Sequence, residues 1–295
     1  ILHAHSSSLL TAVLASALPP HPRVVWHNHF GKKPGLRLAT AWWLLSRRAA
    51  AVVSASHELK AFARTVLRVP DPWSWYLPNF PAPPPSTSTS QEVALPGIAG
   101  RRVVCLANLR AEKNHRGLLA AFESVVATIP DAHLLMVGDD ADAQLIGRLQ
   151  SEAAIRGIEH RVHWLGLRTD VADLLRACDV GVLASDSEGL PLALLEYGQA
   201  RLPVVATDVG QVRNVMHDGR AGRLVPPGDM DGLAREIVGL LKSAEQRESL
   251  GALLQQRVAS NFSLEAAVEL THSIYDAVLR SSPLGARRPA RVHSS

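Results

Sequence analysis

Two carboxylates lie close together in the stretch SDSEGLPLALLEY, where seven residues separate Glu188 from Glu196. The apolar spacing that follows Glu188 predicts a helix over residues 190–200. A carboxylate repels phosphate but accepts hydrogen bonds from hydroxyl groups. We therefore expect Glu188 to contact sugar hydroxyls and Glu196, about two turns into the helix, to contact a pair of ribose hydroxyls. A surface acid and a helix-face acid with no ligand would leave the same pattern.

The start of the predicted helix has the chemistry of an anion site. Pro191 is its second residue, and proline is tolerated in a first helical turn. The N–H groups at Gly189 and Leu190 lack helical partners, and the helix dipole is positive there, which suits a diphosphate.

Cations lie in a second loop, within ANLRAEKNHRGLLAAF. A strand is predicted to end at Asn108, and a helix to begin near Asn114, a residue type that caps helices. Arg110 and Lys113 lie between them, where they could neutralise a leaving diphosphate. Solvated loop charges are the alternative interpretation.

The surrounding elements explain why these residues would meet. Runs that are apolar throughout, joined by helical segments, predict parallel sheets covered on both faces. We expect strands at ILHAHS, RVVWHN and AAVVSAS, and then at RRVVCLAN, AHLLMVGD, RVHWLG, DVGVLAS and LPVVATD. Between the two groups lies a segment rich in Pro, Ser and Thr, which is typical of a linker. Ligands of such sheets bind at the carboxyl ends of the strands, where all the residues named above are expected.

The order of the motifs carries a resemblance. A loop L-x-x-x-K-N, then VGDD, then S-E-G with E-(seven residues)-E, then DGRAGRLVPPGD, resembles the retaining glycosyltransferases of family four (group one). The resemblance implies an α/β GT-B fold, in which two Rossmann-like domains with parallel sheets face a cleft. We expect a partial acceptor-side domain over 1–81, a linker over 82–100 and a nucleotide-sugar domain over 101–262. A terminal helix over 263–280 would return to the first domain, and 281–295 would be a disordered basic tail.

The resemblance also implies roles for individual residues. Glu188 matches the acid on the donor sugar, Gly189–Leu190 the backbone site for the diphosphate, and Glu196 the acid on the ribose. Lys113 matches the phosphate-binding lysine. In VVWHNHFG, His29 matches the histidine that faces the transferred sugar.

The sequence also departs from the family pattern. Asn108 stands where the family commonly has arginine, so that Arg110 becomes the alternative phosphate cation, and Asn214 occupies the position of a usual glutamate. The Gly-rich first loop of the family is missing, so we expect the first domain to be incomplete. In the family that loop helps to bind the donor phosphate and the acceptor, so an inactive chain is the alternative expectation.

The predicted reaction is transfer of a sugar from a nucleoside-diphosphate sugar to an acceptor hydroxyl with retention of configuration, in polysaccharide or glycolipid biosynthesis. The acceptor would be a sugar or a lipid-linked molecule, and we expect no nucleic-acid partner. A GT-B epimerase or phosphorylase, and a non-catalytic nucleotide-binding relative, remain as alternatives.

No metal or other cofactor is expected, since cations and a helix terminus can hold the diphosphate. Asp140 and Asp142 are also favoured at the opening of a helix, where they need no ion. His3 and His5 alternate along a strand and share a face, but no Cys or carboxylate partner is evident in the sequence, so no metal is expected there. The segment 27–29 is interpreted as a polar strand end that lines the cleft.

Composition and charge indicate the cellular compartment of the protein. The chain has 47% hydrophobic and 20% charged residues, a net charge of +4 and two cysteines, both in apolar runs, so a reducing, cytoplasmic compartment is expected. The stretch GKKPGLRLATAWWLLSRR surrounds Trp42 and Trp43 with Lys32, Lys33 and arginines. This pattern predicts peripheral contact with the anionic inner face of a membrane. Packing of the same aromatic residues on the sheet is the alternative.

Overall fold

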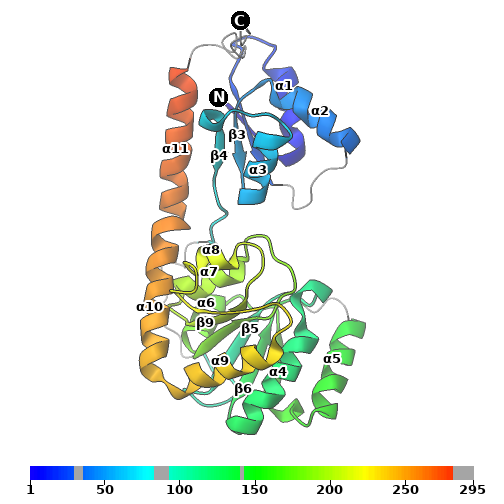
Figure 1. Ribbon diagram of the computed structural model, residues 1–295, viewed down its shortest axis with the longest axis vertical. Helices are drawn as coiled ribbons and strands as arrows, with labels where there is room; N and C mark the ends of the chain where they lie inside the picture. The colour runs from blue at the N-terminus through cyan, green and yellow to red at the C-terminus, as the bar shows by residue number, and fades with distance from the viewer. Residues whose placement is uncertain (30–35, 83–92, 140–142, 282–295) are drawn as a thin grey trace, which may run out of the picture. The chain divides into compact units, whose positions relative to one another are not determined.

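The computed structural model describes residues 1–29, 36–82, 93–139 and 143–281, and the side chains of 36–39 are not part of that description. The chain forms two compact units (Figure 1). Unit 1 comprises Ile1–Asn79 and Glu265–Ser295, and unit 2 comprises Phe80–Leu264. Each unit is described by itself.

Unit 1 is built on a parallel sheet with the strand order β1-β2-β3-β4. The strands are β1 (Leu2–His5), β2 (Val24–Asn28), β3 (Ala49–Ser54) and β4 (Ser74–Tyr76). Every residue of β2 and β3 is buried, as the apolar runs predict for a sheet covered on both faces. The helices are α1 (Leu9–Ala15), α2 (Leu36–Ser46), α3 (His57–Thr65) and α11 (Leu264–Arg280), with short 3-10 turns η1 (Ser6–Ser8) and η2 (Asp71–Trp73).

The C-terminal helix α11 packs against the sheet of unit 1. Its Ala267, Ile274 and Val278 are buried in one apolar cluster with residues of β2 and β3. The guanidinium of Arg23 donates to the carbonyl of Val278 and to the hydroxyl of Ser281. A segment from the far end of the sequence therefore completes the core of the N-terminal unit, as Figure 1 shows.

The aromatic residues of α2 face the core of unit 1. Trp42, Trp43 and Leu45 pack partly buried against the apolar cluster that contains Trp26. The rings of Trp26 and Trp42 stack, with centroids 5.1 Å apart and planes inclined by 7°. The guanidinium of Arg47 lies 4.9 Å from the centre of the Trp43 ring. The structure thus gives these rings a packing role on the sheet.

Several residues named from the sequence lie outside the described part of the chain. They include Lys32 and Lys33 of the basic segment, Asp140 and Asp142, and the tail from residue 282 onward. Among the described residues, no helix combines the length and the apolar character that a membrane span requires.

Unit 2 is built on a six-stranded parallel sheet with the order β10-β9-β8-β5-β6-β7. The strands are β5 (Arg102–Leu106), β6 (His133–Val137), β7 (Val162–Gly166), β8 (Val180–Leu183), β9 (Val204–Thr207) and β10 (Arg223–Val225). The helices are α4 (His115–Thr128), α5 (Ala143–Ile155), α6 (Val171–Arg176), α7 (Leu192–Gln199), α8 (Val212–Val215), α9 (Met230–Lys242) and α10 (Ala244–Asn261), with short 3-10 turns η3 (Ala111–Lys113) and η4 (Glu159–Arg161).

The sheet of unit 2 separates two apolar cores, one on each face. The chain proceeds from β5 outward to β6 and β7, then returns to the other side of β5 for β8, β9 and β10. The boundary between β5 and β8 is therefore the point at which the strand order reverses, where such sheets bind ligands. Two short edge strands, β4 and β10, were not among the predicted strands, because three residues are too few to show a pattern.

Tyr197 anchors α7 beneath this reversal point. Its ring is fully buried against Gly181 of β8, where an added Cβ would lie 3.0 Å from the ring. Its hydroxyl accepts a hydrogen bond from the N–H of Leu106 at 2.7 Å and lies 3.3 Å from the carbonyls of Val104 and Val182. One phenol thus holds β5, β8 and α7 together.

We expect Tyr197→Phe to lower the free energy of unfolding by about 1–3 kcal/mol, because the N–H of Leu106 loses its acceptor while the apolar packing is kept. Urea denaturation followed by circular dichroism measures this quantity. The slope of the free energy of unfolding against urea concentration should stay unchanged, since the surface exposed on unfolding is nearly the same. An unaltered midpoint would show that the hydroxyl does not stabilise the sheet.

Candidate functional site

An ion pair lies at the carboxyl edge of the unit 2 sheet. Lys113 Nζ is 2.7 Å from Glu188 Oε1, and the two side chains are 21% and 6% exposed. The hydroxyl of Ser185 donates to the same carboxylate oxygen at 2.6 Å. Glu188 is therefore a shielded carboxylate with two donors. The sequence placed both charges at strand ends but did not predict that they pair.

Strand order explains why these distant residues meet. Lys113 ends η3, the turn after β5, and Glu188 lies in the loop after β8. The two strands are parallel neighbours, with Val103 opposite Val180, so their carboxyl ends reach the same edge. The charges are thus brought together by the reversal point of the sheet.

Hydrogen bonds join the β5 and β8 loops. Asn114 adopts a left-handed conformation, with φ 50° and ψ 44°, and its Oδ1 accepts from the N–H of Gly117 to cap α4. Its Nδ2 donates to Asp186 at 2.9 Å, and the N–H of Asp186 donates to the carbonyl of Glu112 at 2.8 Å. Asparagine tolerates this conformation better than most residues, so one side chain caps the helix and ties two loops.

The loop after β9 supports the Glu188–Gly189 backbone. The N–H of Gln211 donates to the carbonyl of Gly189 at 2.9 Å, and the hydroxyl of Thr207 donates to the backbone carbonyl of Ser185 at 2.6 Å. Gly210 has φ +55°, and a Cβ at this position would lie 2.0 Å from the Glu188 carbonyl oxygen. Only a residue without a side chain fits beneath this loop. The loops after β5, β8 and β9 therefore form one connected edge.

The helix after Glu188 begins later than the sequence predicts. Pro191 is extended, with φ −73° and ψ 111°, and precedes the first residue of α7, Leu192. Gly189 and Leu190 consequently belong to the loop, and the predicted start at Leu190 is wrong by two residues. Their N–H groups make no hydrogen bond within the described chain, so they remain available to an anion.

Glu196 lies in the second turn of α7 and is partly buried. Burial raises the pKa of its carboxyl group above the ordinary value of 4.5, because the charged form loses solvation. An ionised carboxylate at this position therefore lowers the stability of the folded chain.

The comparisons with known proteins identify this region. Residues 100–243 match the family model described as "Glycosyl transferases group 1". Residues 100–243 form a group 1 glycosyl transferase domain.

Curated relatives agree with that assignment. The chain is 33% identical over 183 residues to N-acetyl-alpha-D-glucosaminyl L-malate synthase of Bacillus anthracis, covering 62% of this chain and 47% of that protein. It is 33% identical over 165 residues to phosphatidyl-myo-inositol mannosyltransferase of Mycolicibacterium smegmatis, covering 54% and 41%. The chain thus spans about half or less of the length of these relatives.

Solved structures show the fold. A glycosyltransferase from Rickettsia africae superimposes with a TM-score of 0.81 at 17% identity, over 96% of this chain and 78% of that one. Alr3699/HepE of Anabaena, solved in complex with UDP, gives 0.75 at 18% identity, over 93% and 79%. The α/β fold is that of the GT-B glycosyltransferases.

At two positions where the glycosyl transferase domain departs from the family pattern, the residue makes hydrogen bonds within the protein. Asn108 Oδ1 accepts from the N–H of Asp139, which joins the β5 and β6 loops, and its carbonyl lies 3.1 Å from His115 Nε2. Asn214 accepts hydrogen bonds from Arg257 of α10. Arg110 is exposed in the same loop as Lys113.

The remaining predicted site residue, His29, lies in unit 1. Its Nε2 is 3.0 Å from His5 Nδ1, and its ring centroid is 3.9 Å from that of His27. Burial, and then the neighbouring His5, lower the pKa of His29, which favours a neutral imidazole. The strand end interpreted as a polar lining is therefore a cluster of histidines.

We expect Glu196→Gln to raise the stability of the glycosyl transferase domain at pH 7 more than at pH 4. The folded chain binds the Glu196 proton more tightly than the unfolded chain does. The loss of stability caused by the ionised carboxylate is therefore absent below pH 4.5 and grows as the pH rises above that value. Thermal unfolding of both proteins at the two pH values measures the difference. A gain of the same size at both values would mean that the charge is not its cause.

Proposed function

We propose that this chain transfers a sugar from a nucleoside-diphosphate sugar to an acceptor hydroxyl, with retention of configuration. The observation that carries the proposal is the Lys113–Glu188 pair at the reversal point of the sheet. A cation for phosphate and a shielded acid for sugar hydroxyls lie side by side, next to the uncommitted N–H groups of Gly189 and Leu190. These groups would contact the diphosphate and the sugar of a nucleotide sugar.

The pair also suggests how the donor binds. Glu188 is ion-paired with the Lys113 ammonium. The diphosphate competes for that ammonium with a larger negative charge, and Glu188 then accepts hydrogen bonds from the sugar. Lys113, with Arg110 nearby, and the loop N–H groups would stabilise the leaving diphosphate, so the proposed transfer requires no metal. Glu196 would bind the ribose, and His29 would face the transferred sugar.

The similarity to glycosyltransferases named for polysaccharide and glycolipid products supports a sugar or lipid-linked acceptor. The proposed partners are therefore a nucleotide sugar and such an acceptor. Peripheral contact with an anionic membrane stays a prediction.

We expect Lys113→Ala to weaken nucleoside-diphosphate binding by about 1–3 kcal/mol, the value of a charge-assisted hydrogen bond. Titration calorimetry with UDP, GDP and ADP measures this effect for whichever nucleotide binds most tightly. Lys242→Ala, at an exposed lysine at the end of α9, is the matched control and should bind as the unaltered chain does. Equal affinities for the unaltered chain, Lys113→Ala and Lys242→Ala would show that Lys113 does not bind the nucleotide.

We expect Glu188→Gln to have the opposite effect on the nucleotide. Removing the carboxylate frees Lys113 and removes repulsion from the diphosphate, so the affinity for the free nucleotide should be kept or increased. The additional affinity of the corresponding nucleotide-glucose, measured against the free nucleotide, should fall, because an amide is a weaker acceptor than a carboxylate for sugar hydroxyls.

The ratio of the dissociation constants for the free nucleotide and the nucleotide-glucose tests the role proposed for Glu188. If Glu188→Gln weakens the free nucleotide and leaves the contribution of the sugar unchanged, the role proposed for Glu188 is wrong. A chain that binds nucleotide but shows no sugar contribution from Glu188 would fit the non-catalytic relative instead.

A further inference from the structure

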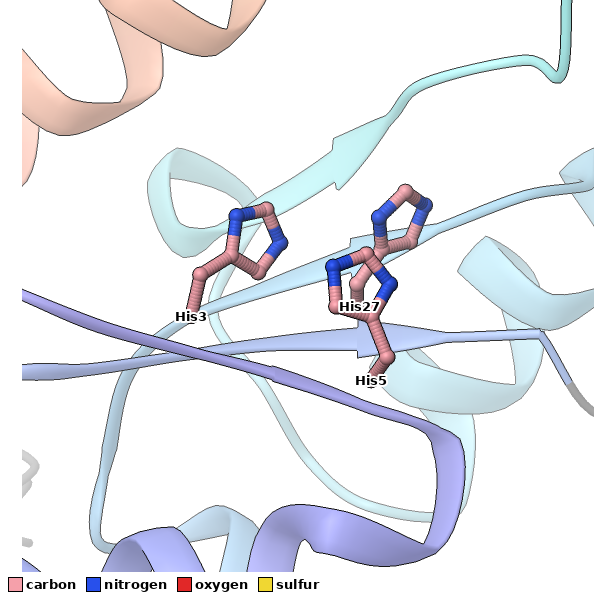
Figure 2. A group of neighbouring side chains, drawn as sticks. All are labelled: His3, His5 and His27. Atoms are coloured by element: carbon pink, nitrogen blue, oxygen red, sulfur yellow. The ribbon is translucent and has the colours of Figure 1, made fainter.

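A cluster of imidazoles lies at the end of two neighbouring strands in unit 1. His3 and His5 point to one face of β1, and His27 of β2 lies opposite His5 in the parallel register. Figure 2 shows the three rings gathered over that face. Their ring centroids are 4.6, 5.1 and 5.5 Å apart in pairs. The third ligand that the sequence did not reveal is therefore supplied by strand pairing.

The distances suit a shared ion. One potential ligand nitrogen from each of the three histidines lies within 4.8 Å of the other two. A tetrahedral zinc ion, with Zn–N bonds of about 2.0–2.1 Å, holds its ligand nitrogens about 3.4 Å apart. Small rotations of the rings would close that difference. His5 is exposed, so an ion can enter and a fourth position stays open to solvent.

Hydrogen bonding leaves ring nitrogens of His3 and His27 unused, whereas Nδ1 of His5 lies 3.0 Å from His29 Nε2. His3 Nδ1 lies 2.6 Å from the hydroxyl of Tyr275 on α11, whereas its Nε2 is buried without a partner. His27 is 6% exposed, and neither of its ring nitrogens has a hydrogen-bond partner among the described residues. Buried polar atoms are normally satisfied, so two such rings side by side call for a ligand. Tyr275 has the position of the outer partner that typically orients a metal-bound histidine.

The cluster also has the correct charge state. Burial and the neighbouring imidazoles lower the pKa of His3 to about 4 and that of His27 to about 3. Both rings are therefore neutral at pH 7, with a lone pair to donate.

We propose that His3, His5 and His27 bind one divalent transition-metal ion of the zinc class. Neutral imidazoles without thiolate or carboxylate ligands favour Zn²⁺, Co²⁺, Ni²⁺ and Cu²⁺ over Mg²⁺ and Ca²⁺. The Tyr275 hydroxyl accepts from His3 Nδ1–H and orients its Nε2 towards the ion. The proposal rests on residues of unit 1 alone and does not depend on the proposed function, although His29, which is proposed to face the transferred sugar, contacts His5.

The test is titration calorimetry of the full chain, without an affinity tag, with Zn²⁺ and separately with Mg²⁺ at pH 7. We expect one Zn²⁺ per chain and no Mg²⁺. His5→Gln should lower the affinity at least tenfold, and because His5 is exposed, its replacement should leave the fold intact. Tyr275→Phe should lower the affinity about tenfold, as loss of an outer-sphere partner does.

The matched control is His163→Gln. His163 and His133 form another close histidine pair, with 2.8 Å between ring nitrogens, in unit 2. This variant should bind Zn²⁺ as the unaltered chain does. X-ray absorption of the Zn²⁺ or Co²⁺ form should show three imidazole ligands, reduced by one in His5→Gln. Absence of Zn²⁺ binding, unchanged binding in His5→Gln, or loss of binding in His163→Gln would each overturn the proposal.

Discussion

The Lys113–Glu188 ion pair is the interaction on which the candidate site depends. A carboxylate as shielded as that of Glu188 would be costly without partners, and it has two donors, the ammonium of Lys113 and the hydroxyl of Ser185. The charges of Lys113 and Glu188 thereby offset each other. In a nucleotide sugar, the diphosphate can pair with Lys113 and the sugar hydroxyls can donate to Glu188. Binding would therefore exchange the contacts of both residues and leave neither charge unpaired.

Sheet topology makes the ion pair possible, and the loops then maintain it. Parallel strands direct all their carboxyl ends to one edge, and the reversal of strand order at β5 and β8 places two following loops next to each other. Backbone contacts from Asp186 to Glu112 and from Gln211 to Gly189 join those loops to a third. Gly210 permits the close approach. The residues of the site are thus positioned by backbone hydrogen bonds between the loops together with the side chains of Asn114 and Thr207.

Unit 1 uses the same geometry with different chemistry. The ends of β1 and β2 bring imidazoles together instead of opposite charges, and their burial keeps the rings of His3 and His27 neutral. Neutral rings can stack closely where charged ones would repel each other. The helix α11 contributes Tyr275 to this cluster, so the C-terminal segment takes part in both the core and the polar end of the sheet.

The sequence by itself determined the class of fold and the edge at which chemistry is placed. Apolar runs that alternate with helical segments allow only covered parallel sheets, and residues that follow such runs must lie at the carboxyl edge. Lys113, Glu188 and Gly189 could therefore be assigned to one edge from their order alone. Tertiary structure decided which of them touch. The pairing of Lys113 with Glu188, the link from Asn114 to Asp186, and the arrival of His27 beside His3 and His5 depend on strand order and register, which arise from contacts between segments far apart in the chain. The start of α7 at Leu192 and the inward packing of Trp42 were also decided there, because local propensity fixes a helix end only to within a turn and cannot tell which surface an aromatic face will cover.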